Sequence, residues 1–151
     1  MVVLVLLGLL AGVELTHVLE WPAKTQLPGP EWLAVQNHLY GGYATFGAVA
    51  ELLILAVSVV LAIGLLVVRD RQGWVFCAVA VAIAAMLTVF ALGLQPLNIA
   101  LSHLSPTALP ADWTQLRDRW SAYHTVCFAL AFAAFAIVLG EVSWRRPSTA
   151  T

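Results

Sequence analysis

The sequence predicts an all-α integral membrane protein in which four helices form a bundle across the bilayer. Of its 151 residues, 62% are apolar and 10% are charged, a balance well outside the range of soluble domains. Four stretches are long and apolar enough to cross the hydrocarbon core as helices. All six tryptophans lie at the ends of these stretches or between them, which is typical of the membrane interface. We expect one domain.

The four predicted helices cover residues 2–20, 43–68, 74–95 and 112–143, followed by a tail at 144–151. The first helix has no Lys or Arg before its apolar run, and it continues into Glu14 and His17 rather than a small-residue cleavage site. These features favour a retained helix over a cleaved signal peptide. The second stretch is longer than a perpendicular crossing requires, so we expect it to tilt or protrude.

Prolines and a capping residue suggest where the helices end. Lys24 follows Pro22 in a Pro-rich and Trp-rich segment that we expect to be a loop. Pro96 is expected to close the third helix, and Asp112 is suited to cap the start of the last helix. The last helix therefore begins before it enters the membrane.

The positive charges predict an orientation. Arg69, Arg71, Arg145 and Arg146 fall on one side, whereas Lys24, Arg117 and Arg119 fall on the other. The excess on the first side places both termini in the cytoplasm. A net charge of −1 with no basic stripe argues against a nucleic-acid partner, so the expected partner is the lipid bilayer. The sequence identifies no protein partner.

The ionisable side chains gather toward the Trp-rich side of the membrane. The histidines are His17, His38, His103 and His124, and the glutamates are Glu14, Glu20 and Glu51. A charged side chain within a span costs several kcal/mol unless it is paired or wet, so such residues usually face the bundle interior and mark a site. For His38 and His103, in loops or at helix starts, the default expectation is exposure to solvent.

The spacing on the first helix leaves two interpretations open. Glu14, His17 and Glu20 recur every three residues and share one broad face. A Glu-x-x-His step also presents ligands to dinuclear metal centres, but those centres need a second such step, which the chain lacks. A transition metal or haem is one interpretation, and a structural carboxylate–imidazole hydrogen bond is the other. The sequence requires no cofactor. The candidate metal ligands are Glu14, His17, Glu20, His38, Glu51 and His124.

The second helix presents Tyr40, Tyr43, Gly47 and Glu51 as one stripe. We expect Gly47 to let another helix approach closely beside Glu51. Glu51 is then a proton acceptor or a metal ligand, or else a hydrogen-bond partner of a neighbouring helix.

The last helix presents Arg117, Trp120 and His124 on one face. Arg117 is the expected counter-ion of Glu20 or Glu51, and the alternative is that the whole cluster only holds the helices together. Lys24 is expected to reach a carboxylate or an anionic ligand, or simply to extend to the interface.

Two groups of motifs resemble a known family. The first runs from Gln95 through Pro96-x-Asn98 to the segment PADWTQLRDRWSAYH, which ends at His124. The second is His17-x-x-Glu20-x-Pro22-x-Lys24 followed by Gln36-x-x-x-Tyr40. Together they resemble the small four-helix membrane proteins grouped around fungal anthrone oxygenases, most bacterial members of which are a domain of unknown function. The second group is similar to one bacterial branch.

This resemblance implies a bacterial membrane protein that oxidises a hydrophobic aromatic or quinone-like substrate with dioxygen. The family-matching positions are Asn98, Trp113, Arg117, Trp120 and His124, whereas Cys127 stands where many members have arginine.

Two functional hypotheses follow. In the first, the chain is an oxidoreductase whose catalytic residues are His124, Glu51, Arg117 and His17. His124 or Glu51 takes a proton from the substrate, and Arg117 stabilises the oxyanion. The expected substrate-binding residues are Trp120, Asn98, Trp113, Tyr40 and Lys24. In the second, the chain is a non-enzymatic membrane subunit or a lipophile-binding or metal-binding protein whose polar cluster is structural.

Overall fold

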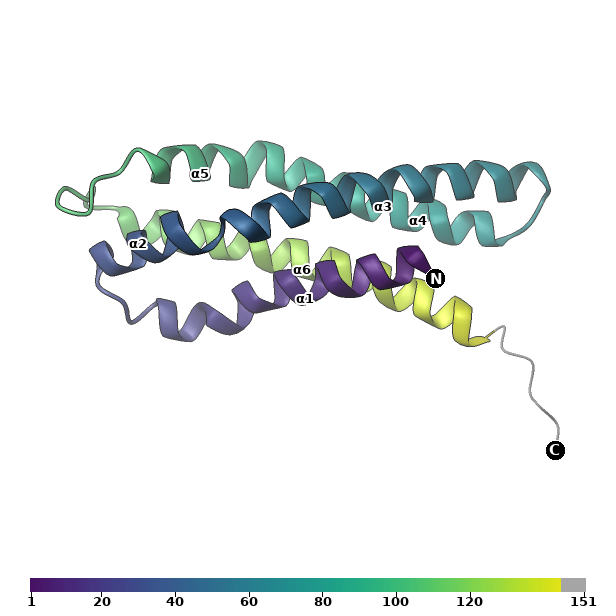
Figure 1. Ribbon diagram of the computed structural model, residues 1–151, viewed down its shortest axis with the longest axis horizontal. Helices are drawn as coiled ribbons and strands as arrows, with labels where there is room; N and C mark the ends of the chain where they lie inside the picture. The colour runs from purple at the N-terminus through teal and green to yellow at the C-terminus, as the bar shows by residue number, and fades with distance from the viewer. Residues whose placement is uncertain (145–151) are drawn as a thin grey trace, which may run out of the picture.

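The computed structural model describes residues 1–144, which form an elongated all-α bundle (Figure 1). Its helices are α1 (Val2–Lys24), α2 (Gly29–Leu39), α3 (Gly41–Val67), α4 (Gln72–Val89), α5 (Gln95–Ser102) and α6 (Trp113–Trp144). A π-helical segment, η1 (Phe90–Leu94), joins α4 to α5 and makes Gln72–Ser102 one continuous helix. This continuous helix, α1, α3 and α6 are each long and apolar enough to cross a membrane. The predicted fold class is therefore confirmed.

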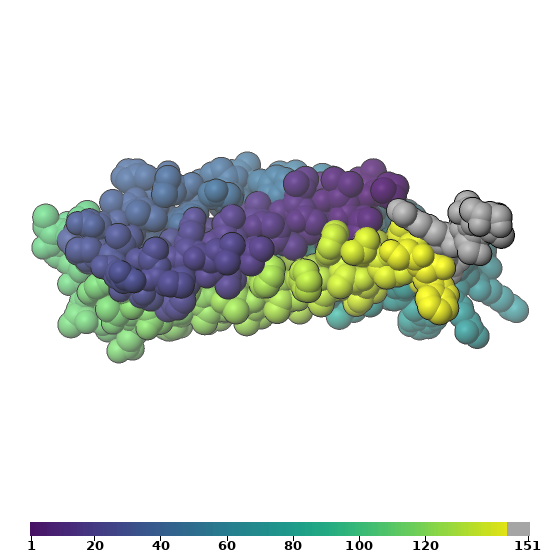
Figure 2. Space-filling view, turned by 90° about the horizontal axis from the view of Figure 1, so that it is seen from below, coloured from purple at the N-terminus to yellow at the C-terminus, as the bar shows by residue number. Residues whose placement is uncertain are grey.

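The helices pack in antiparallel pairs. The main pairs are α1 with α6, α3 with α4, and α4 with α6. The start of α1, the α3–α4 turn and the end of α6 lie at one end of the bundle, and α2 lies at the other, which we call the α2 end (Figure 1). One face of the molecule shows α1 and α6 side by side (Figure 2).

Apolar side chains fill the core and also cover the outside. Leu7, Leu10, Ile54 and Ile83 are fully buried between the helices. Large apolar side chains such as Val60, which is 69% exposed, point away from the bundle. In a membrane these outward side chains face lipid, which accounts for the apolar excess in the composition.

The segment after the first span is more helical than predicted. Lys24 is the last residue of α1 rather than part of a loop, and Pro22 lies inside the helix. The helix continues past this proline because the Thr25 N–H donates to the Trp21 carbonyl at 3.0 Å. Residues 29–39 then form α2, where Pro30 occupies the first turn, the position in a helix that tolerates proline.

The third span was predicted to end at Pro96. In the structure it continues to Ser102. The π-helical segment η1 lies directly before this proline. Widening a helix by one residue per turn relieves the missing N–H and the ring clash that proline causes, so the helix need not stop. Asn98 is consequently held inside a helix rather than in a loop.

The last helix begins at Trp113, immediately after the predicted capping residue Asp112. The Gln115 N–H donates to the backbone carbonyl of Asp112 at 2.9 Å. Trp144, the first residue of the predicted tail, is instead the last residue of α6, and the rest of the tail, including Arg145 and Arg146, lies outside the described residues.

Candidate functional site

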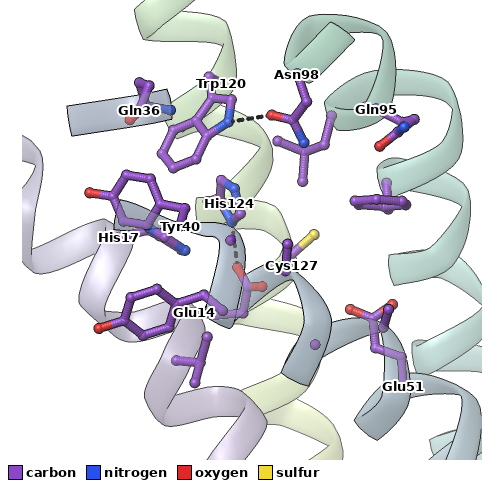
Figure 3. Close-up of a pocket in the computed structure, with 18 of the residues that line it drawn as sticks. Glu14, His17, Gln36, Tyr40, Glu51, Gln95, Asn98, Trp120, His124 and Cys127 are labelled. Carbon is purple, nitrogen blue, oxygen red and sulfur yellow. Dashed lines mark hydrogen bonds and ion pairs between the residues drawn. The ribbon is translucent and has the colours of Figure 1, made fainter. Parts of the chain in front are cut away.

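A cavity of about 570 Å³ lies among the helices (Figure 3). Every long helix and α2 contribute to its wall. The polar and aromatic residues that line it are Glu14, His17, Gln36, Asn37, Tyr40, Tyr43, Glu51, Phe90, Gln95, Asn98, Trp120, His124 and Cys127. Its volume is in the range of small-molecule sites, and its mixture of apolar wall and a few polar groups is typical of them.

A carboxylate–imidazole pair joins α1 to α6 on the cavity wall. Nδ1 of His124 lies 2.8 Å from Oε2 of Glu14, and both side chains are almost buried. This hydrogen bond offsets the cost of placing a carboxyl group inside the bundle. It also fixes the orientation of the imidazole ring, as in sites where a carboxylate orients a general base.

His17 lies at the centre of an aromatic cluster. Its ring centroid is 4.1 Å from that of His124, 4.9 Å from Tyr40 and 5.0 Å from Trp120. The side chain is 3% exposed, and its Nδ1 atom has no hydrogen-bond partner. A buried polar atom without a partner costs about 1–3 kcal/mol. Such an atom on a cavity wall is a candidate contact for a ligand.

A second hydrogen bond fixes the indole of Trp120. Its Nε1–H donates to Oδ1 of Asn98 at 3.0 Å, which links α6 to α5 (Figure 3). The same indole lies against His124, with ring centroids 4.1 Å apart. Asn98 therefore holds the aromatic wall beside the carboxylate–imidazole pair.

An ion pair lies beside this aromatic wall, toward the α2 end of the bundle. The Tyr40 hydroxyl donates to Glu20 at 2.7 Å, and Lys24 Nζ forms an ion pair with the same Glu20 oxygen at 3.0 Å. Burial raises the pKa of the Tyr40 phenol well above its usual value, and the bond to Glu20 adds to this effect. Lys24 Nζ also lies 4.2 Å from the centre of the Tyr40 ring and 4.9 Å from that of Trp120. A positive charge is thus placed directly behind the aromatic rings.

Glu51 lies on the far side of the cavity from His17 and Tyr40 (Figure 3). It is 8% exposed and forms no hydrogen bond or ion pair with any residue in 1–144. The side-chain oxygen of Gln36 is likewise buried without a partner. The buried oxygen of Gln36 is therefore a candidate contact for an occupant of the cavity, and Glu51 is free to contact the same occupant.

The structure brings together most of the predicted site residues. Seven of them line the cavity: Glu14, His17, Tyr40, Glu51, Asn98, Trp120 and His124. Lys24 and Glu20 lie just behind Tyr40 rather than on the wall. His38 and His103 are exposed, as expected for these two, and His38 is thereby separated from the other candidate metal ligands.

The predicted ion pair of Arg117 is wrong. Its Nε pairs with Asp118 at 3.0 Å, and its Nη1 donates to the Thr25 carbonyl at 3.2 Å. The guanidinium lies between Trp21 and Trp113, outside the cavity. Arg117 lies two helical turns from His124 toward the α2 end of the bundle, where closer polar partners compete successfully for it.

Two further expectations differ from the structure. Trp113 does not line the cavity but packs against Trp32, with ring centroids 5.8 Å apart. Gly47 does not admit a close helix, since a Cβ built there meets nothing within 4 Å. The open space beside Gly47 is part of the cavity instead.

The sequence reasoning missed Gln36, Asn37, Gln95 and Cys127 as cavity residues. Gln95 carried a usable signal, because it is a polar residue at the end of an apolar span and lies three positions before Asn98. Gln36 and Cys127 carried a weaker signal, since Gln36 belongs to the Gln36-x-x-x-Tyr40 motif and Cys127 follows His124 by three positions. Asn37 carried none, because its position depends on α2 being a helix.

The metal and haem interpretations gain no support from the side-chain geometry. Within residues 1–144, no group of three or more His, Cys, Asp and Glu side chains is placed to hold a metal ion. A haem bound between His17 and His124 does not fit, because their rings are in contact, with centroids 4.1 Å apart.

Comparison of the chain with family models, curated proteins and solved structures finds no match. The chemistry of the site is therefore inferred from the residues that line the cavity or lie beside it. The arrangement combines an oriented imidazole, an unpaired carboxyl group and a nearby lysine beside an aromatic wall. These groups are suited to binding an aromatic molecule, removing a proton from it and stabilising the anion.

Proposed function

We propose that this protein is a membrane oxidoreductase that oxidises a hydrophobic aromatic or quinone-like substrate with dioxygen, in the manner of anthrone oxygenases. The observation that carries the proposal is the 2.8 Å pair of His124 and Glu14 on the wall of a cavity of about 570 Å³. An oriented base inside an apolar cavity is what removal of a weakly acidic C–H or O–H proton requires.

In the proposed reaction His124 is the general base. The reaction requires the tautomer in which Nδ1–H donates to the Glu14 carboxylate, because the lone pair of Nε2 is then free to accept a proton from the substrate. Negative charge then develops on the substrate oxygen. Lys24 takes the place that the sequence suggested for Arg117. It is paired with Glu20, and its positive charge acts through the Tyr40 and Trp120 rings rather than by direct contact with the substrate oxygen.

The oxidation balances with dioxygen as the only co-reactant. The base breaks a C–H bond of a ring methylene, and the resulting carbanion gives electrons to dioxygen and forms a C–O bond. The terminal peroxide oxygen takes the proton back from His124. Cleavage of the second C–H bond at the same carbon and of the O–O bond then releases water and leaves a carbonyl, so one methylene and one dioxygen give one carbonyl and one water.

The test is oxidation of anthrone by the full chain in lipid nanodiscs, followed by oxygen uptake and quinone absorbance. We expect His124→Gln to lower kcat/KM by about 10²–10⁴-fold, the usual contribution of a general base. His103→Gln is the matched control, because His103 is exposed and does not line the cavity. Folding of both variants is checked by circular dichroism and gel filtration.

Two results count against the proposal. One is a wild-type protein that is folded but consumes no oxygen with anthrone or a related phenol. The other is a folded His124→Gln variant with unchanged kcat/KM, which excludes the imidazole as the base.

A second function, a non-enzymatic lipophile-binding protein, is favoured by the way the polar bonds link different helices. The His124–Glu14 bond joins α6 to α1, and the Trp120–Asn98 bond joins α6 to α5. On this hypothesis Glu14→Gln lowers stability in detergent, and anthrone binds without being consumed.

We further propose that the protein lies in a bacterial cytoplasmic membrane with both termini in the cytoplasm. The start of α1 lies at the same end of the bundle as the turn that carries Arg69 and Arg71, which supports this orientation (Figure 1). A membrane-impermeant maleimide should then label Ser105→Cys from outside intact cells but not Gln72→Cys. The reverse pattern would contradict the orientation.

A further inference from the structure

The cavity reaches the outer surface of the bundle on one side. Its wall includes Ala44, Ala48 and Leu52 of α3, all of which are exposed, and Leu52 is 58% exposed. Across from them, Gln95 also lines the cavity and is exposed. These residues belong to helices that are apolar enough to cross a membrane, so most of this side opening faces lipid.

The packing of α3 leaves this side open. Among residues 1–144, α3 packs mainly along α4 and to a lesser extent along α1, but it forms no comparable contact with η1 or α5. On this side the cavity is lined by Ala48 and Leu52 on α3 and by Leu87 and Phe90 on the facing helix, which we take as the border of the opening. The border of the opening is therefore apolar both on α3 and on the facing helix.

Gly47, on the same wall, has no packing explanation. Its φ is not positive, and a Cβ built there meets nothing within 4 Å. Glycine in a helix interior costs about 1 kcal/mol relative to alanine. Here the missing side chain widens the cavity beside the opening.

Two buried polar groups in the cavity point independently to an occupant. His17 is 3% exposed and its Nδ1 atom has no partner. The side-chain oxygen Oε1 of Gln36 is also buried and has no hydrogen-bond partner. Both side chains line this cavity, so an occupant that reaches them must carry polar atoms.

We propose that the cavity takes its ligand sideways from the bilayer, through a portal between Ala48 and Leu52 of α3 and Leu87 and Phe90 of the facing helix. The ligand class is an amphiphile with an oxygen-bearing aromatic head and an apolar chain. The head contacts His17, and the chain leaves through the portal into lipid. The identity of the head rests on the proposed function, whereas the portal rests on the exposed apolar border.

The probe is para-decylphenol with a diazirine near the end of its chain, photolysed with the full chain in nanodiscs and mapped by mass spectrometry. Labelling is expected on peptides covering 44–52 and 87–95. Excess unlabelled decylphenol should reduce it, but decylbenzene, which lacks the hydroxyl, should not. Ala48→Phe should lower both the competable label and kcat/KM for anthrone by about tenfold, equivalent to ~1.4 kcal/mol. Ala129→Phe is the control, because Ala129 is exposed on α6 and does not line the cavity.

The portal, the proposed reaction and the binding site can each be contradicted by a different result. Competable labelling confined to residues 25–40 would mean access from the aqueous side and would overturn the portal. An unchanged kcat/KM for anthrone in the Ala48→Phe variant would also overturn the portal. Competable labelling in the portal of a protein that does not oxidise anthrone would support the portal and overturn the proposed reaction. Equal labelling of all lipid-facing helices without competition overturns the binding site itself.

Discussion

The hydrogen bond between Trp120 and Asn98 should contribute measurably to the stability of the bundle. The indole is 3% exposed, and its Nε1–H has a single acceptor, Oδ1 of Asn98, at 3.0 Å. Asn98→Leu keeps the number and branching of the side-chain heavy atoms but removes that acceptor. The buried N–H is then left without a partner, which costs about 1–3 kcal/mol.

A double-mutant cycle separates this bond from other effects of the substitutions. Trp120→Phe removes the donor, and in that background Asn98→Leu should cost less. Interhelical hydrogen bonds in membrane proteins give coupling energies of about 0.6 kcal/mol on average and at most about 1.7. Since this bond is buried beside other rings, we expect about 1 kcal/mol.

The assay is reversible unfolding in mixed micelles with increasing SDS, followed by circular dichroism, for the wild type, both single variants and the double variant. Coupling below about 0.3 kcal/mol, within the scatter of independent sites, would refute the reasoning. It would mean that Asn98 holds Trp120 in place no better than apolar packing does.

Two further predictions concern a glycine pair and a cation pair. A Cβ at Gly73 would lie 2.5 Å from Cγ of Leu66, so Gly73→Ala should destabilise the protein by about 1–3 kcal/mol in the same unfolding assay. A Cβ at Gly47 meets open space, so Gly47→Ala should stabilise the protein by up to ~1 kcal/mol. A change in the free energy of unfolding with the same sign in both variants would contradict the packing argument. Lys24→Met should lower kcat/KM for anthrone by about tenfold, because it removes a positive charge that acts only through the Tyr40 and Trp120 rings. Arg117→Met, whose guanidinium lies outside the cavity, should stay near the wild-type value, and an equal loss in both variants would assign Lys24 no special role.

The sequence alone was sufficient for the fold class and for the approximate position of the site. Helices that cross a bilayer are specified by local composition, since about 20 apolar residues are needed wherever a helix spans the core. The cost of an ionisable group in a span is also local, so the positions of Glu14 and Glu51 in the chain were enough to indicate the relevant half of the bundle. Both line the cavity.

The helix ends were less predictable, because proline does not have the same effect everywhere. Pro22 lies inside α1, and the continuous third span passes Pro96. Propensity places a break at such residues, but a π-helical turn and the packing of neighbouring helices can compensate for one missing N–H.

Only the tertiary structure decided which polar groups become partners. His124 and Glu14 are 110 positions apart in the chain, and their hydrogen bond depends on how α1 and α6 are rotated against each other. The same packing places the Arg117 guanidinium between Trp21 and Trp113, beside the Thr25 carbonyl, rather than next to Glu20 or Glu51. Helical periodicity shows which residues share a face, but not which face of another helix they meet, because that choice depends on side-chain packing along the whole contact.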